Sequence, residues 1–168
     1  MDKTILLTAF CGTSSELLLK CVKNYETLIL SNDKIKDYEK LIEVISKGKF
    51  DYIISFGQRP NIKNKVHIET SAHHHDFFIS TNFNCEKLKV LFEQRHIASK
   101  ISHNAGTSYC NELYLNGLRY ISQHKLNTEM VFVHVPFITN IDDFSGFSKK
   151  IIDTLQELNR LHNEHKDS

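Results

Sequence analysis

The sequence predicts an α/β fold in which a mostly parallel sheet is covered by helices on both faces. Short apolar runs alternate with longer segments whose apolar residues recur at helical spacing, and this alternation is typical of parallel sheets. The length of 168 residues is that of one domain, since domains usually contain roughly 100–200 residues. With six Gly and two Pro, the chain has no segment that looks like a linker. We therefore expect residues 1–168 to form a single domain.

The first part of the chain predicts three buried strands and two helices. The first strand is a short apolar run that ends near Gly12, and a helix can open after it at Ser14 or Ser15. The side chains of residues 31–33 can cap a second helix, and Gly48 can end it. The expected strands are residues 4–9, 27–30 and 51–56, and the expected helices are residues 14–21 and 34–47.

The pattern is weaker after Gly57. Residues 65–72 alternate enough to predict a strand, and residues 76–80 could form another. Residues 98–102 and the apolar run at 130–135 predict two more strands. Because the last two are consecutive strands separated by one helix, we expect them to be neighbours in the sheet. Helices are expected at residues 85–96, 108–123 and 148–165.

Charge and hydropathy exclude several classes of partner. Lys and Arg (21) nearly cancel Asp and Glu (20), so the sequence lacks the basic excess that binds nucleic acid or an acidic membrane. No apolar run approaches the roughly 18 residues that a transmembrane helix requires. The apolar run at residues 5–10 is too short for a signal peptide. We expect a cytoplasmic protein with neither nucleic acid nor membrane as a partner.

The four cysteines form no C-x-x-C pair, so in a reducing compartment they are expected to be free thiols. Cys110 lies where a Gly-containing turn (residues 103–108) leads from a strand into a helix. The dipole of a helix N-terminus favours a thiolate, and nearby amide groups can hold an oxyanion. A buried structural cysteine is the commoner alternative for a single Cys.

His134 lies inside the apolar run of residues 131–136. Taken alone it could be a core histidine, but its predicted position near Cys110 favours a Cys–His pair at the edge of the sheet. Such a pair needs a third group, normally a carboxylate or an amide, to orient the imidazole.

These segments carry a resemblance to a known family. The pattern S-x-x-A-G-x-x-x-C-N at residues 102–111, followed by F-V-H-V-P at residues 132–136, resembles pyroglutamyl peptidase I, a family of cysteine peptidases. Residues 5–10 and 50–58 are similar to the first and third strands of that family, and residues 80–94 also look similar. The resemblance implies a phosphorylase/hydrolase-like, three-layer αβα fold with a mixed sheet.

The resemblance also implies roles for individual residues. Cys110 would be the nucleophile and His134 the general base and acid, while Glu69 occupies the place of the glutamate that orients the histidine. Such enzymes remove a pyroglutamyl residue from peptide N-termini through an acyl-enzyme and use no cofactor. Substrate-binding positions implied by the resemblance are Phe10, Gly57 and Gln58.

The sequence departs from the family around the implied substrate pocket. The family motif G-F-E-P-F-G-G has two phenylalanines that enclose the lactam ring, but here only Phe10 remains. The family has a G-G-R loop whose arginine is assigned to the oxyanion site. In this chain the segment from Gln58 to Lys63 stands in that place, and Arg59 is displaced from the position of the family's arginine. Arg59 could serve as a substitute oxyanion donor or be a solvated surface residue. The long segment after Glu69 is mostly absent. These differences leave two further interpretations: hydrolysis of another small N-acyl or lactam amide, or binding of a peptide end or small ligand without cleavage.

Two other features suggest less. His73, His74 and His75, together with His67 and His96, invite a metal interpretation. Consecutive strand residues point to opposite faces, so three adjacent histidines rarely converge on one ion, and we expect no metal. The Leu stripe of the terminal helix at residues 148–165 would suit a homo-oligomer contact.

Overall fold

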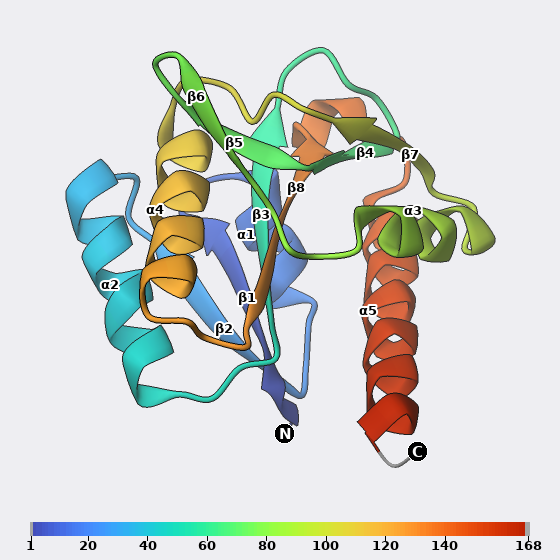
Figure 1. Cartoon of the computed structure of the whole chain (residues 1–168). Coiled ribbons are helices and arrows are strands. Elements are labelled where there is room, and N and C mark those ends of the chain that lie inside the picture. Colours follow the sequence, from blue (N-terminus) through green and yellow to red (C-terminus); the bar gives the residue numbers. More distant parts are fainter. Residues whose placement is uncertain (1, 167–168) are drawn as a thin grey trace.

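A six-stranded mixed sheet forms the centre of the computed structural model, which describes residues 2–166 (Figure 1). Its strand order is β2-β1-β3-β8-β4-β7, and all neighbours are parallel except β8 and β4. The predicted mostly parallel sheet is therefore confirmed. The strands are β1 (Asp2–Phe10), β2 (Tyr25–Leu30), β3 (Tyr52–Arg59), β4 (Lys65–Glu69), β7 (Ala98–Ser102) and β8 (Glu129–Pro136), and a separate hairpin contains β5 (Ser71–His74) and β6 (Phe77–Ser80).

Helices cover both faces of this sheet, as the three-layer prediction requires. Helices α1, α3 and α5 pack on one face and α2 and α4 on the other, so each face has its own cluster of buried apolar side chains. Figure 1 shows α2 and α4 on one side of the strands and α3 and α5 on the other. The helices are α1 (Ser14–Lys20), α2 (Lys34–Lys47), α3 (Cys85–Gln94), α4 (Tyr109–Gln123) and α5 (Phe144–Lys166), with a 3-10 turn at Ile138–Asn140.

The helix starts follow the capping rules. Asp33 caps α2, because its carboxylate accepts hydrogen bonds from the backbone N–H groups of Ile35 and Lys36. Gly48 follows the last residue of this helix, as predicted. The first helix begins at Ser14, as predicted, and is capped by the Thr13 hydroxyl, which accepts the N–H of Glu16.

The prediction that the strands at 98–102 and 130–135 are neighbours is wrong. Strand β4 lies between β7 and β8 and runs antiparallel to β8. The rule that consecutive strands are adjacent fails here because β7 lies at the edge of the sheet, while the chain returns after α4 to form β8 in its middle. The nucleophile candidate on α4 and the histidine candidate on β8 therefore do not follow adjacent strands.

The segment 65–72 also differs from the prediction. It breaks at Thr70 into β4, which belongs to the main sheet, and β5, which pairs with β6 in the hairpin. Thr70 turns the chain by contacting β7: its N–H donates to the backbone oxygen of Ser102 at 2.8 Å. The terminal helix begins at Phe144 rather than at residue 148.

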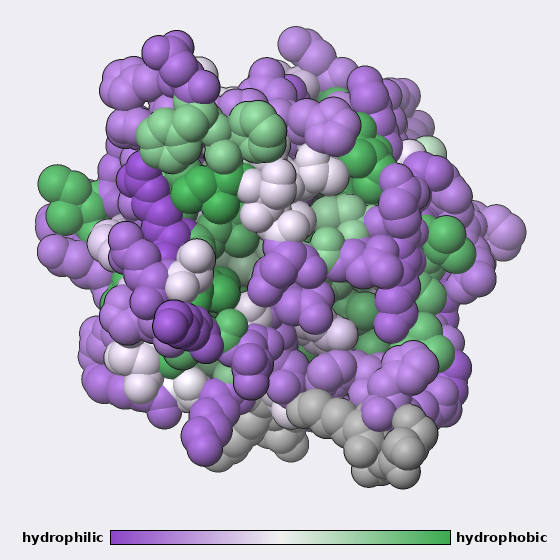
Figure 2. Space-filling model, viewed as in Figure 1, coloured by the Kyte–Doolittle hydropathy of each residue, from purple (hydrophilic) through white to green (hydrophobic). Residues whose placement is uncertain are grey.

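The β5–β6 hairpin lies outside the main sheet and packs against α4. Its outer strand exposes Phe77 and Phe78, and hydrophobic residues are visible over this hairpin at the upper left of Figure 2. Among residues 2–166, no helix has the length and apolar character needed to cross a membrane.

Candidate active site

The candidate site lies where the ends of β3 and β8 meet the start of α4. In the parallel β3–β8 pair, Gly57 is opposite His134 and Arg59 is opposite Pro136. In the antiparallel β8–β4 pair, His67 is opposite His134 and Glu69 is opposite Phe132. Because residues in register project to the same face of a sheet, Gly57, Arg59, His134, His67 and Glu69 share the face that α4 covers.

Glu69 and His134 are joined by a buried hydrogen bond. The Nδ1–H group of His134 donates to Oε1 of Glu69 at 2.8 Å, and Glu69 is completely buried. The two residues are diagonal neighbours across the antiparallel pair, a spacing that long side chains can bridge. Since Nδ1 must carry the proton to donate to a carboxylate, the neutral imidazole has its lone pair on Nε2. This is the tautomer that a general base requires.

Cys110 lies over Gly57, the register partner of His134 on the neighbouring strand. A Cβ atom placed on Gly57 would be only 2.6 Å from Sγ of Cys110, so glycine leaves the space that the thiol occupies. Cys110 is the second residue of α4, and the N-cap residue Ser108 makes no side-chain capping bond. In the described residues, no hydrogen bond joins Sγ to His134; catalytic hydrogen bonds are often long before substrate binds.

Burial raises the pKa of the Cys110 thiol to about 12, and the negative charge of Glu69 acts in the same direction. The Cys110 backbone amide and the positive charge of Arg59 oppose the increase but do not overcome it. The thiol is therefore protonated at neutral pH, and a base must take its proton before it can attack a carbonyl carbon.

Glu69 stays ionised despite its burial. Burial by itself would raise the pKa of the carboxyl group, but the hydrogen bond from His134, the nearby Ser102 hydroxyl and the positive charge of Arg59 outweigh it and lower the pKa. The backbone of Glu69 is also fixed, because the buried Tyr114 hydroxyl donates to its carbonyl oxygen at 2.8 Å.

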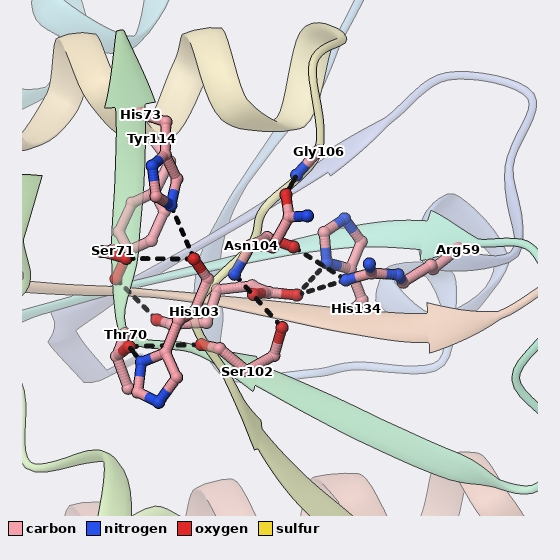
Figure 3. A network of polar contacts seen from close by, with 11 residues as sticks. Arg59, Thr70, Ser71, His73, Ser102, His103, Asn104, Gly106, Tyr114 and His134 are labelled. Carbon is pink, nitrogen blue, oxygen red and sulfur yellow. Dashed lines mark hydrogen bonds and ion pairs between the residues drawn. The ribbon is translucent and has the colours of Figure 1, made fainter. Parts of the chain in front are cut away.

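The loop before Cys110 is held by polar contacts on several sides (Figure 3). Nη1 of Arg59 donates to the carbonyl oxygen of Asn104 at 2.8 Å, and the Asn104 side chain accepts the N–H of Gly106 at 2.9 Å. Nε2 of His73 contacts the carbonyl oxygen of His103 at 2.6 Å. The loop is thereby fixed to β3 and to the hairpin, which places the first turn of α4.

Asn111, next to Cys110, attaches α4 to the hairpin. Its carboxamide accepts the N–H of His73 at 2.9 Å and donates to the His73 carbonyl oxygen at 2.8 Å. The amide of Asn111 is buried and pairs with the backbone as another strand would. This two-point contact explains why asparagine follows the cysteine.

A cavity of about 390 Å³ opens beside the thiol. Its wall combines aromatic rings with uncharged polar groups, and no Asp, Glu, Lys, Arg or His of the described chain lines it. The lining residues are Phe10, Thr13, Asn32, Gln58, Pro60, Ser108, Tyr109, Cys110 and Phe137.

The structure brings most of the candidate residues of the sequence together. Phe10 and Gln58 line the cavity with Cys110, and Gly57 lies under the thiol. Arg59 does not line the cavity; its Nη1 donates to Oε1 of Glu69 at 2.9 Å. The Gln58 side-chain oxygen accepts the N–H of Ser14 at 3.1 Å, which leaves the Nε2 group of Gln58 to donate elsewhere.

Two residues near the site have no role there in the sequence analysis, which considered His67 only as a metal ligand and did not name Phe137. His67 is buried opposite His134, and neither of its ring nitrogens has a hydrogen-bond partner among residues 2–166. The i, i+2 spacing of His67 and Glu69 on one strand was the signal that they share a face. Phe137 enters the cavity from the end of β8, a position that motif matching does not reveal.

The histidines at 73–75 do not cluster with other ligands. His73 contacts the His103 carbonyl group, while the ring of His74 packs against those of His75 and Phe77. In the part of the chain that the structure describes, no group of three or more His, Cys, Asp or Glu side chains could hold a metal ion.

Fold and site together define a class: a three-layer α/β protein with a cysteine at a helix start beside a carboxylate-bound histidine, the side-chain set of cysteine hydrolases. The model of the pyroglutamyl peptidase family matches residues 62–146, which is half of the chain and contains Glu69, Cys110 and His134. The chain belongs to the pyroglutamyl peptidase family.

Curated relatives carry the same family name. The chain is 29% identical to the pyrrolidone-carboxylate peptidase of Brachyspira hyodysenteriae over 126 residues, which cover 62% of this chain and 62% of that protein. It is 39% identical to pyrrolidone-carboxylate peptidase 2 of Caldanaerobacter subterraneus over 46 residues, which cover 27% of this chain and 22% of that protein. The match thus spans less than two thirds of the length of these relatives.

Solved structures share the fold over nearly the whole chain. The pyrrolidone carboxyl peptidase of Fervidobacterium islandicum has a TM-score of 0.79 at 19% identity and is matched over 93% of this chain and 98% of its own. Pyroglutamyl peptidase I of Bacillus amyloliquefaciens also has a TM-score of 0.79 at 19% identity, with 92% and 93% covered. At this identity the comparison establishes the α/β fold.

Gly57 offers a test of how the thiol is accommodated. In Gly57→Ala the new methyl group would meet Sγ of Cys110 at 2.6 Å and the Phe132 ring at 2.8 Å, so we expect a loss of about 1–3 kcal/mol of stability from overpacking. Iodoacetamide labelling of Cys110, followed by mass spectrometry, should change in rate because the thiol is displaced. Gly117→Ala is the control, since its methyl group would meet the flexible end of Met130 instead. Labelling of Cys110 at the wild-type rate in Gly57→Ala would contradict the predicted displacement.

The lowered pKa of Glu69 predicts a pH-dependent component of stability. Its folded-state pKa lies below the usual value of 4.5, so the carboxylate stabilises the native state fully above that pH, and this stabilisation is lost as the pH falls through the folded-state pKa. Glu69→Gln removes this component. Urea unfolding at a series of pH values from about 7 to 3 should show a steeper loss for the wild type than for the variant. Parallel curves would mean that Glu69 is not the ionised partner of His134.

Proposed function

We propose that the protein is a cysteine peptidase that removes an N-terminal pyroglutamyl residue from peptides. Cys110 is the nucleophile, His134 the general base and acid, and Glu69 the group that orients His134. The observation that carries the proposal is the buried hydrogen bond from His134 to Glu69, with the Cys110 thiol over Gly57, the register partner of His134. Membership in the pyroglutamyl peptidase family supports the same reaction.

The proposed reaction has two stages. Nε2 of His134 takes the thiol proton, Sγ of Cys110 attacks the carbonyl carbon of the scissile amide, and the imidazolium gives the proton to the departing amine, leaving a thioester. Water then attacks the thioester with His134 again as the base, which releases pyroglutamate and restores the thiol. No step needs a cofactor.

The proposed substrate site is the cavity beside Cys110. Phe10 supplies an apolar wall, and Gln58 can donate its Nε2–H groups to a carbonyl oxygen because Ser14 already holds its side-chain oxygen. Gly57 leaves room for the reacting atoms next to the thiol. Cys110 lies in the first turn of α4, where backbone N–H groups lack partners within the helix, and such groups can stabilise the oxyanion.

Turnover of a fluorogenic pyroglutamyl amide tests the proposal. We expect cofactor-free wild-type protein to release the fluorophore, and we expect Cys110→Ala to lose turnover to background because the attacking atom is absent. His134→Asn should reduce kcat by at least about 100-fold, the lower end of what a general base contributes. Cys21→Ala is the control, since this exposed thiol makes no contact with the site. Absence of turnover by the pure wild-type protein would refute the proposed pyroglutamyl peptidase activity.

A second candidate function is hydrolysis of another small N-acyl or lactam amide. The composition of the cavity supports it, because Tyr109, Ser108 and Asn32 line it beside Phe10 and Phe137. A third candidate is a protein that binds a peptide end without cleaving it, and the missing Cys110–His134 hydrogen bond among residues 2–166 supports that candidate.

Substrate selectivity separates these candidates. Because the cavity wall is uncharged, we expect kcat/KM to be at least about tenfold higher for a pyroglutamyl amide than for the matching glutaminyl amide, whose free ammonium group would have to be desolvated without a partner. A panel of N-acyl amides with one common fluorophore makes the measurement. Preference for a different neutral acyl group would support the second candidate. Tight binding with no product from any amide would support the third.

A further inference from the structure

Arg59 contacts both the carboxylate of Glu69 and the loop before Cys110. Figure 3 shows its guanidinium group beside Asn104 and His134. Its Nη1 group donates to Oε1 of Glu69 at 2.9 Å and to the carbonyl oxygen of Asn104 at 2.8 Å. The same Oε1 atom accepts the Nδ1–H of His134 at 2.8 Å. Oε1 of Glu69 is therefore shared by the His134 imidazole and the Arg59 guanidinium group. The guanidinium group in turn connects this oxygen to the loop before Cys110.

The burial of Glu69 gives this contact its importance. The Glu69 side chain is 0% exposed and that of Arg59 is 28% exposed, and a buried carboxylate is costly unless a charge compensates it. Without Arg59, a proton on His134 would be the nearest compensation. With Arg59 in place, the carboxylate is neutralised whether His134 is protonated or not.

The titratable side chains around His134 come from three elements: Arg59 from β3, His67 and Glu69 from β4, and Cys110 from α4. Burial, followed by the charge of Arg59, lowers the pKa of His67, so that imidazole is neutral at pH 7. The Cys110 thiol is also neutral. The charge balance around His134 is thus set by Glu69 and Arg59.

We propose that Arg59 is a positioning residue of the candidate triad. It holds the Glu69 carboxylate in place against His134 and anchors the loop before α4 through Asn104, so that the start of α4 presents Cys110. Arg59 acts through Glu69 and Asn104 and does not line the cavity. The inference rests on the triad roles assigned under the proposed function.

The test compares Arg59→Met, which removes the charge, with Arg59→Lys, which keeps it. The main readout is the rate of Cys110 alkylation by iodoacetamide as a function of pH, measured on the Cys110 peptide by mass spectrometry. In Arg59→Met we expect the acid limb of this profile to move to higher pH by about one unit, because the positive charge of Arg59 lowers the pKa of the Cys110 thiol and its loss disfavours the reactive thiolate. Arg59→Lys should keep the limb near its wild-type position.

Turnover of the pyroglutamyl amide supplies the second readout. We expect Arg59→Met to lower kcat roughly tenfold, about the factor that an altered transition-state contact of 1.4 kcal/mol produces, with KM nearly unchanged because Arg59 is not in the cavity. Arg119→Met is the matched control: Arg119 also lies on the α4 side but stacks on the Phe77 ring of the hairpin. Arg119→Met should leave both the alkylation profile and the turnover of the pyroglutamyl amide as in the wild type.

The outcomes separate the positioning role from its alternatives. An unchanged alkylation profile in folded Arg59→Met would overturn the proposal; if kcat fell sharply at the same time, Arg59 would be an oxyanion donor instead. If Arg59→Met fails to fold, Arg59→Lys decides the question. Because this variant retains the charge, a shift of the acid limb of its alkylation profile would overturn the proposal. Alkylation needs no peptide, so a shifted limb without turnover would support the positioning role and refute only the peptidase.

Discussion

The carboxylate of Glu69 is the interaction on which the geometry of the site depends. It is completely buried, and its Oε1 atom accepts hydrogen bonds from both His134 and Arg59. A buried anion with two such partners has little freedom to rotate, because any other rotamer would leave a charge uncompensated. The imidazole ring, the guanidinium group and the loop that Arg59 holds are all placed relative to this one oxygen.

Burial of the same site also determines how the thiol must react. The protein cannot keep Cys110 as a free thiolate, since burial raises its pKa to about 12. The helix N-terminus that suggested an activated thiolate in the sequence is present, but its effect is smaller than that of burial. In the reaction we propose, the thiol is activated by proton transfer to Nε2 of His134, and the tautomer fixed by Glu69 leaves that nitrogen free to accept the proton.

The sequence predicts the fold well where the signals are local. Apolar runs and caps located β1, β3, β8 and α2, and the alternation of strands and helices gave the layers. The position of β4 between β8 and β7 could not be predicted, because it depends on a long-range antiparallel pairing that no local pattern encodes.

Cys110 and His134 stood out from their neighbours in sequence, whereas Glu69 was assigned through the family resemblance. The contact of Arg59 with Glu69 could not be predicted from the sequence, because it depends on how the ends of β3 and β4 are placed in the folded protein.

The antiparallel pairing of β4 with β8 explains why the three candidate groups can meet although they do not follow adjacent strands. Glu69 lies opposite Phe132, two residues before His134, so its carboxylate reaches Nδ1 along the diagonal of the ladder. The parallel pairing on the other side of β8 puts Gly57 opposite His134. Nδ1 of the imidazole is thus bound on the β4 side, while the thiol lies over β3, where the absence of a Cβ on Gly57 leaves room for it. The mixed sheet thus gives His134 two different neighbours: the Glu69 carboxylate on one side, and on the other the space over Gly57 that the Cys110 thiol occupies.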